Sequence, residues 1–259
     1  MGTRLPILMY HSIGADNATE VPLGWSRFHT VPYSSFCAQL DLLIERGRHA
    51  ISPAHLNRAE RIENPIAITF DDGHLSDVIA AEALKSRGLQ AIFFITWANI
   101  GRRHYLSAND VRTLDRLGFK IGSHGMTHVN LTGETPVGMR SQLAESKSRL
   151  EDLLGEAVND VAVPYGRYND QLIETAMALG YRRIMTSDFA CANLGNSTVL
   201  PRLGITSETS MHDFEQMVTA RPFDLARQRI RIGINRRLKN VVSRAANLRS
   251  AITNNHLAP

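Results

Sequence analysis

Short apolar segments alternate with longer helical stretches through most of this chain, and this alternation restricts the fold more than any other feature. Seven segments have the composition of β-strands: Ile7–Tyr10, Ile66–Phe70, Ala91–Thr96, Phe119–Gly122, Val161–Val163, Arg182–Thr186 and Val199–Ile205. Repeated strand–helix units build parallel sheets, because each helix returns the chain to the start of the next strand. The sequence therefore predicts an α/β fold with a parallel sheet or a barrel.

Five stretches between the strands place apolar residues three and four positions apart, which is the spacing of one helix face. They are Ser34–Arg46, Ser76–Arg87, Asn109–Leu117, Pro136–Leu154 and Asp170–Leu179. A glycine follows each stretch, where a left-handed C-terminal cap forms, and Asn109 and Asn169 are candidate N-caps. The 259 residues, 43% of them hydrophobic, can bury one large core, so we expect one main domain over residues 1–220.

The C-terminal residues 221–259 differ from the rest of the chain in charge. They contain nine Lys or Arg and one acid, whereas residues 1–220 contain 20 bases and 24 acids. Apolar residues form one stripe from Ile234 to Ile252, which predicts a basic amphipathic helix. The stripe suits packing on the main domain, or peripheral contact with an anionic membrane through residues 225–252. We expect no nucleic-acid partner, because no aromatic residues alternate with the charges.

The amino end lacks the basic stretch, apolar run and small-residue cleavage site of a secretory signal. No window reaches the roughly 20 apolar residues that span a bilayer. These patterns predict a cytoplasmic protein that contacts a membrane, if at all, from its surface. Cys37 and Cys191 are too few and too far apart in sequence for a disulfide framework or a thiolate metal site. The oligomeric state stays open.

Two adjacent carboxylates, Asp71 and Asp72, directly follow the strand that ends at Phe70. An Asp-Asp-Gly segment after a strand is often only a polar turn. Alternatively, the two carboxylates can take part in a reaction. Successive side chains diverge and like charges resist joint ionisation, so one carboxylate can bind a cation while the other stays free as a base.

A second cluster, His124 and His128, follows the strand Phe119–Gly122. Imidazoles four residues apart can bind one ion, although a chain with ten histidines also contains this spacing by chance. One carboxylate and two imidazoles make a three-ligand site with open positions for water and substrate, as in catalytic zinc and non-haem iron centres. Both clusters follow predicted strands, at the edge where barrel active sites assemble. Together they predict a hydrolytic metal site.

Two further strand ends belong to the same edge. The strand Val161–Val163 continues into Pro164–Gly166, a turn that can aim a backbone N–H at an oxyanion. His11 follows the strand Ile7–Tyr10. Taken alone, His11 is as readily a hydrogen-bonded core histidine as an acid, but its place among the other strand ends favours the acid.

Three of these segments, Thr69–Gly73, His124–His128 and Pro164–Gly166, resemble the first three motifs of the polysaccharide deacetylases. This group is the NodB-homology group of carbohydrate esterase family 4. The resemblance extends over about residues 5–206. It implies a distorted (β/α) barrel of about seven strands, a divalent ion that is usually Zn²⁺, and removal of N-acetyl groups from an amino sugar in a glycan or a glycan precursor.

The resemblance also implies a role for each residue of the site. Asp72, His124 and His128 would bind the ion, Asp71 would be the catalytic base, and the backbone N–H of Tyr165 would help to bind the oxyanion. A bound divalent ion lowers the pKa of its water and polarises a carbonyl, and amide hydrolysis at neutral pH needs both effects.

The chain departs from the family pattern in three places. Ala162 stands where many members carry an arginine that orients the base. The region Tyr181–Asp188 lacks the usual tryptophan, which leaves Asp188 as a candidate for a supporting role only. No apolar-apolar-histidine motif, the usual source of the general acid, occurs near the C-terminus, where residues 199–204 stand instead.

One branch of the family, similar to the biofilm poly-N-acetylglucosamine deacetylases, begins with a strand like Leu8–His11, as if circularly permuted. This resemblance assigns the general acid to His11, and His212 is the alternative. Two other functions stay open. Ala162 and the missing tryptophan of Tyr181–Asp188 motivate one alternative, a catalytically impaired carbohydrate-binding protein. An iron(II) oxygenase would use the same three ligands, but usually on a β-sandwich rather than on alternating strands and helices.

Overall fold

The structure is a computed structural model that describes residues 4–16, 21–22, 25–51, 62–193, 198–221 and 223–230. The chain divides into two compact units, Met1–Ala220 and Arg221–Pro259. In the second unit, residues 223–230 are helical. The predicted amphipathic stripe Ile234–Ile252 lies outside the described residues, so the basic helix and its membrane contact stay predictions.

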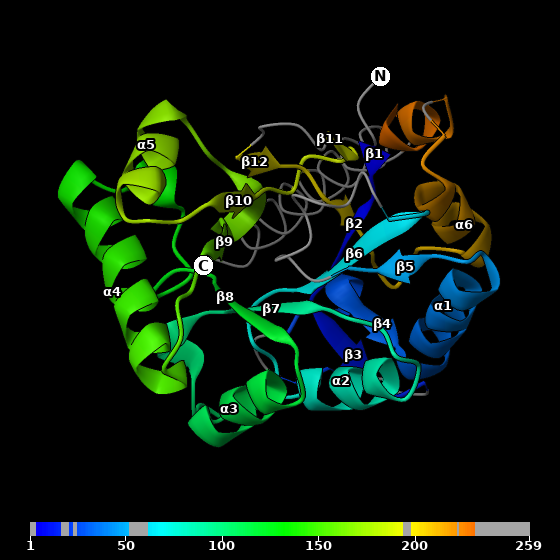
Figure 1. Cartoon of the computed structure of the whole chain (residues 1–259), viewed down its shortest axis with the longest axis horizontal. Helices are drawn as coiled ribbons and strands as arrows, with labels where there is room; N and C mark the ends of the chain where they lie inside the picture. Colours follow the sequence, from blue (N-terminus) through cyan, green and yellow to red (C-terminus); the bar gives the residue numbers. More distant parts are fainter. Residues whose placement is uncertain are drawn as a thin grey trace, which may run out of the picture. The chain divides into compact units, whose positions relative to one another are not determined.

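A parallel sheet forms the centre of the first unit (Figure 1). In the order of hydrogen-bonded neighbours its strands are β12 (Val199–Leu200), β10 (Arg183–Met185), β9 (Asp160–Ala162), β8 (Lys120–Ser123), β7 (Ile92–Ile95), β6 (Pro65–Phe70), β2 (Ile7–Tyr10) and β13 (Leu203–Gly204). A short strand, β5 (His49–Ala50), pairs with the first residues of β6. All of these pairings are parallel, so the carboxyl ends of the strands meet at one edge.

The two outermost strands of the sheet are neighbours in the chain. β12 pairs with β10, β13 pairs with β2, and only Pro201 and Arg202 separate β12 from β13. Residues 199–204 therefore connect the two edges and curl the sheet into a distorted barrel. The strand predicted over Val199–Ile205 is interrupted at Pro201, because proline has no N–H to donate to a neighbouring strand. With β12 and β13 taken as one segment, the predicted barrel of about seven strands is confirmed.

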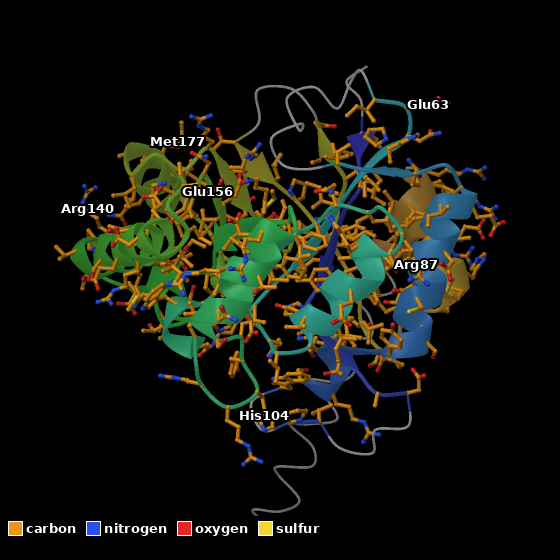
Figure 2. The ribbon with its side chains drawn as sticks, turned by 60° about the horizontal axis from the view of Figure 1, so that its bottom comes forward. Glu63, Arg87, His104, Arg140, Glu156 and Met177 are labelled. Carbon is orange, nitrogen blue, oxygen red and sulfur yellow. The ribbon has the colours of Figure 1, made fainter. Side chains whose placement is uncertain are left out.

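Helices cover the outside of the sheet (Figure 1). Their bounds are α1 (Tyr33–Glu45), α2 (Asp77–Lys85), α3 (Ala108–Arg116), α4 (Pro136–Leu154), α5 (Asp170–Ala178) and α6 (Met211–Thr219). The first five agree with the predicted helices to within a few residues. Their outward faces carry exposed side chains such as Arg140 on α4 and Met177 on α5 (Figure 2).

Local caps explain where several helices begin and end. Asn169 caps α5 as predicted, since its side chain accepts a hydrogen bond from the N–H of Leu172 at 2.9 Å. The predicted cap of α3 at Asn109 is wrong. Ser107 caps this helix instead, because its hydroxyl accepts from the Asp110 N–H while the Asp110 carboxylate accepts from the Ser107 N–H, and this reciprocal pair satisfies two free donors.

Two small strand pairs lie outside the main sheet. β1 (Arg4–Leu5) pairs antiparallel with β11 (Ala192–Asn193), and β3 (Ser12–Gly14) pairs in parallel with β4 (Thr30–Pro32). Strands this short carry no periodic pattern, so the sequence did not predict them. The 3₁₀ helix η1 (Arg27–His29) lies between β3 and β4 in the chain, and its last residue, His29, stacks on His11.

Among the residues that the structure describes, none of the helices has the length and the apolar composition that crossing a bilayer requires. The cytoplasmic location stays a prediction.

Candidate active site

The predicted site residues come from strand ends at one edge of the barrel. His11 follows β2, Asp71 and Asp72 follow β6, and His124 follows β8. Tyr165 lies in the 3₁₀ helix η5 (Pro164–Gly166), three residues after the last residue of β9. The strand ends bring the carboxylate and the histidines together because β2, β6, β8 and β9 run in parallel in one sheet.

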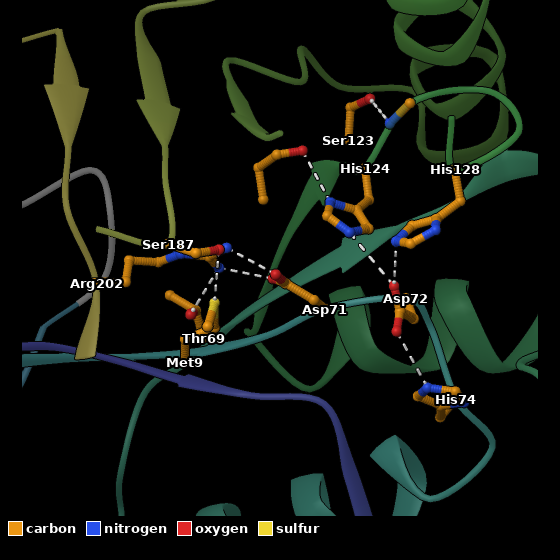
Figure 3. Close-up of polar contacts among 12 residues, drawn as sticks. Met9, Thr69, Asp71, Asp72, His74, Ser123, His124, His128, Ser187 and Arg202 are labelled. Atoms are coloured by element: carbon orange, nitrogen blue, oxygen red, sulfur yellow. Dashed lines mark hydrogen bonds and ion pairs between the residues drawn. The ribbon is translucent and has the colours of Figure 1, made fainter. Parts of the chain in front are cut away.

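Asp72, His124 and His128 form the closest cluster of the site (Figure 3). Asp72 Oδ1 lies 3.3 Å from His124 Nε2 and 3.1 Å from His128 Nε2, and the three donor atoms lie within 4.8 Å of one another. Ligand atoms about 2.0–2.1 Å from a tetrahedral Zn²⁺ lie about 3.3 Å apart. The spacing and the chemistry of these donors therefore fit one divalent cation.

The ring of His124 is oriented by the backbone of β9. Its Nδ1 lies 2.8 Å from the carbonyl oxygen of Ala162, and the side chain is almost fully buried. A proton on Nδ1 is donated to that carbonyl, which leaves Nε2 to face Asp72. Burial lowers the pKa of His124, but the charges of Asp71 and Asp72 and the Ala162 carbonyl raise it by more, so the net shift is upward.

Three residues of the site have left-handed backbone conformations. The φ angle is 77° at Asp72, 56° at His128 and 61° at Tyr165, and only six non-glycine residues of the described chain have a positive φ. Such a conformation costs a non-glycine residue roughly 1–3 kcal/mol, and it is found where the fold must aim a side chain or a backbone group. Three of the six such residues in the described part of the chain therefore belong to the predicted site.

Asp71 is paired with an arginine that the sequence did not predict (Figure 3). Arg202 donates from Nη1 to Asp71 Oδ1 and from Nη2 to Asp71 Oδ2, both at 2.6 Å. Asp71 is 2% exposed and Arg202 is fully buried. Burial raises the pKa of Asp71, but the charges of Arg202 and His124 and the hydrogen bonds from Arg202 lower it by more, so the carboxyl stays ionised at neutral pH.

Arg202 also contacts residues other than Asp71. Its Nε donates to the carbonyl of Thr186 at 3.0 Å, its Nη1 also donates to Thr69 Oγ1 at 3.1 Å, and its guanidinium lies 5.5 Å from the ring centre of Phe94. The backbone N–H of Arg202 donates to the carbonyl of Asp188 at 3.1 Å. The signal in the sequence was a lone arginine inside the apolar segment of residues 199–204, where a buried cation needs an anionic partner.

His11 lies against a second histidine. The rings of His11 and His29 are stacked with centroids 4.4 Å apart, and the buried Nδ1 of His11 has no hydrogen-bond partner among the described residues. Burial lowers the pKa of His11 to about 4, even though Asp72 and Asp71 act to raise it. His11 is therefore neutral at neutral pH in the free protein.

The alternative acid, His212, has a different setting. It is exposed on α6, and its Nε2 lies 3.0 Å from Gln216 Nε2 on the next turn of the same helix.

Two other residues named from the sequence have contacts of their own. The side chain of Asp188 accepts a hydrogen bond from the hydroxyl of Tyr168 at 3.0 Å. Tyr165 is 63% exposed, and its ring centre lies 4.9 Å from that of His128.

The profile of the polysaccharide deacetylase family matches residues 58–184, which include both aspartates, both histidines of the cluster and Tyr165. The chain belongs to the polysaccharide deacetylase family. The resemblance seen in three short motifs is thereby confirmed, and membership supports a carbohydrate deacetylase activity. The assignment to the branch with an N-terminal Leu-Met-Tyr-His strand stays a prediction.

Curated relatives of this polysaccharide deacetylase family protein come from bacteria and a fungus. The Bacillus subtilis protein YxkH is 29% identical over 196 residues, which cover 73% of this chain and 67% of YxkH. A chitin deacetylase of Pestalotiopsis sp is 32% identical over 48% of this chain and 41% of its own length. PgdA of Listeria monocytogenes, a peptidoglycan-N-acetylglucosamine deacetylase, is 26% identical over 60% of this chain and 34% of its own length. The chain thus spans less than half of the last two relatives.

Solved structures share the fold. The Streptococcus pyogenes deacetylase PplD in complex with acetate superposes with a TM-score of 0.76 at 24% identity, over 86% of this chain and 100% of PplD. IcaB from Ammonifex degensii superposes with a TM-score of 0.71 at 22% identity, over 84% of this chain and 97% of IcaB. These similarities support the barrel architecture.

Proposed function

We propose that this protein is a metal-dependent N-deacetylase that removes acetyl groups from an amino sugar in a glycan or a glycan precursor. The observation that carries the proposal is the Asp72–His124–His128 cluster next to a second, separately held carboxylate, Asp71. The names of the chitin deacetylase and of PgdA support an N-acetylated sugar as the substrate.

Asp72, His124 and His128 would hold the metal ion, and Zn²⁺ suits one carboxylate and two imidazoles. The ion would supply Lewis-acid chemistry, lowering the pKa of a water molecule and polarising the acetamide carbonyl. The negative charges of Asp71 and Asp72, which act to raise the pKa of His124, would equally favour a cation at this place.

Asp71 would act as the base. Its carboxylate is ionised and does not share the metal cluster, so it can accept a proton from the attacking water. Arg202 would keep the carboxylate in one orientation by its two hydrogen bonds. The base would therefore have the arginine partner that Ala162 cannot provide, and one reason to consider a catalytically impaired protein is weakened.

The N–H of Tyr165 would donate a hydrogen bond to the developing oxyanion, and the left-handed turn at Tyr165 and Gly166 would aim it. His11 would donate a proton to the departing nitrogen, which leaves as a free amine beside acetate. Since the pKa of His11 is about 4 in the free protein, this role requires negative charge that develops on the substrate to raise it during turnover.

The test is acetate release from N-acetylated chito-oligosaccharides by Zn²⁺-loaded protein. Asp71→Asn should retain bound zinc and lose about 10²- to 10⁴-fold in turnover, the usual contribution of a general base. His124→Ala should lose the zinc itself. A fully active Asp71→Asn protein would contradict the scheme, and a zinc-loaded wild type that binds the sugar without releasing acetate would favour the carbohydrate-binding alternative.

A further inference from the structure

The two oxygens of the Asp72 carboxylate have different neighbours (Figure 3). Oδ1 faces the Nε2 atoms of His124 and His128, and Oδ2 lies 3.3 Å from Nε2 of another histidine, His74. A carboxylate that binds a metal through one oxygen leaves the other oxygen in need of a hydrogen bond. His74 is placed to satisfy this second oxygen, on the side of Asp72 that faces away from the other two histidines.

His74 is held between aromatic rings. It is 3% exposed, its ring stacks on Tyr105 with centroids 5.1 Å apart, and the Trp25 ring meets it edge-on at 4.6 Å. A ring enclosed in this way has little rotational freedom, so its Nε2 has a defined direction.

The backbone around His74 is also anchored. The N–H of Leu75 donates to the carbonyl of His104 at 2.9 Å, and the N–H of Leu106 donates to the carbonyl of Gly73 at 3.0 Å. These two bonds tie the segment that follows Asp72 to the loop before α3. The position of His74 relative to Asp72 therefore depends on the fold and not on the short Asp-Asp-Gly-His segment alone.

The chemistry of the pair determines which atom donates. An ionised carboxylate can only accept hydrogen bonds, so the proton between the two groups belongs to Nε2 of His74. Burial raises the pKa of Asp72, while hydrogen bonds from His124, His128 and His74 lower it by more, which is consistent with an ionised acceptor.

We infer that His74 is a positioning residue, whose Nε2–H holds Oδ2 of Asp72 and thereby directs Oδ1 toward the metal ion. The inference rests on the proposed function, because it concerns the ion that Asp72, His124 and His128 would bind. Outer partners of metal ligands typically contribute about 10- to 100-fold in metal affinity.

The experiment measures Zn²⁺ affinity by competition with a chromophoric chelator, with the full chain and without substrate. His74→Phe keeps a ring between Trp25 and Tyr105 but removes the donor, and it should weaken Zn²⁺ binding about 10- to 100-fold. His74→Gln can place an amide N–H near the position of Nε2, and it should stay within about threefold of wild type. His104→Asn is the matched control. It changes the side chain of a histidine in the loop before α3 and keeps the backbone carbonyl that accepts from the Leu75 N–H, so the affinity should not change.

Wild-type affinity in His74→Phe, or an equal loss in His74→Phe and His74→Gln, would overturn the inference. The melting temperature of each metal-free variant shows whether it folds. If His74→Phe does not fold, His74→Gln decides alone, and a loss of tenfold or more overturns the inference. His124→Ala tests the proposed function separately. If it binds Zn²⁺ as tightly as wild type, the metal site itself is wrong, whereas loss of binding in His124→Ala with normal binding in His74→Phe refutes only the role of His74.

Discussion

Arg202 and Asp71 form a buried ion pair in which both carboxylate oxygens accept a hydrogen bond from one guanidinium, each at 2.6 Å. The two residues are 131 positions apart in the chain. Arg202 belongs to the segment that closes the barrel between β10 and β2, and Asp71 follows β6, the neighbour of β2. The segment that closes the barrel therefore also supplies the arginine that orients the candidate base.

Breaking this pair from one side should strongly destabilise the fold. Arg202→Met leaves the Asp71 carboxylate buried without its partner, and we expect a loss of about 3–5 kcal/mol in the free energy of unfolding. The double variant Arg202→Met, Asp71→Asn removes both charges and should recover part of this loss. Urea denaturation of the three proteins measures the effect, and a double variant less stable than Arg202→Met would show that the charge is not the cause.

The geometry of the pair should matter for turnover as well as its charge. Arg202→Lys keeps a cation but cannot donate two parallel hydrogen bonds to the carboxylate. We expect acetate release to fall at least tenfold, with zinc content unchanged, because Asp71 is then free to rotate away from the attacking water. Kinetics on zinc-loaded protein check this expectation, and wild-type turnover in Arg202→Lys would argue against an orienting role.

Tyr165 should contribute through its backbone and not through its ring. Tyr165→Gly keeps the N–H and suits the φ of 61°, so kcat should stay near the wild-type value and any loss should appear in KM. Tyr165→Pro removes the N–H and cannot adopt this φ, and loss of one oxyanion donor costs about 10²- to 10³-fold in kcat. The zinc content of both variants controls for damage to the cluster. A large fall of kcat in Tyr165→Gly would instead assign the role to the side chain.

The turn that carries Tyr165 should tolerate no side chain at Gly166. Its φ is 67°, and a Cβ there would lie 2.5 Å from Ser187 Cβ and 2.6 Å from the Ser187 backbone nitrogen. Gly155 is the matched control, since its φ is 72° but nothing lies within 4 Å of an added Cβ. Gly155→Ala should cost about 1–2 kcal/mol from backbone strain alone. Gly166→Ala should cost clearly more in the same denaturation experiment, and equal costs would show that the Ser187 contact is relieved easily.

The pH dependence of stability should reveal His11. Its pKa in the folded protein is about 4, below the unfolded value of about 6.5, so unfolding takes up a proton between these pH values. The stability gained from a neutral His11 is present above pH 6.5 and is lost as the pH falls toward 4. In chelator-treated protein, the stability of wild type relative to His11→Gln should therefore decrease over this window. A constant difference would mean that His11 has an ordinary pKa.

Local sequence determined much of this protein. The apolar strands, the helix periodicity and caps such as Asn169 depend on residues a few positions apart, and their signals survive in the sequence. The cluster of Asp72, His124 and His128 was predictable because each segment directly follows a strand, and parallel strands bring their carboxyl ends to one edge. The family motifs added the separate roles of the two aspartates as predictions.

Only the tertiary structure decided which partners these residues have. Nothing near Asp71 in the sequence points to Arg202, because the contact exists only once residues 199–204 have joined β10 to β2. His74 is near Asp72 in the chain, but its direction depends on Tyr105 and on the loop before α3. Long-range closure and packing are collective properties of the folded chain, so residue spacing predicted the clustered donors and could not predict the groups that orient them.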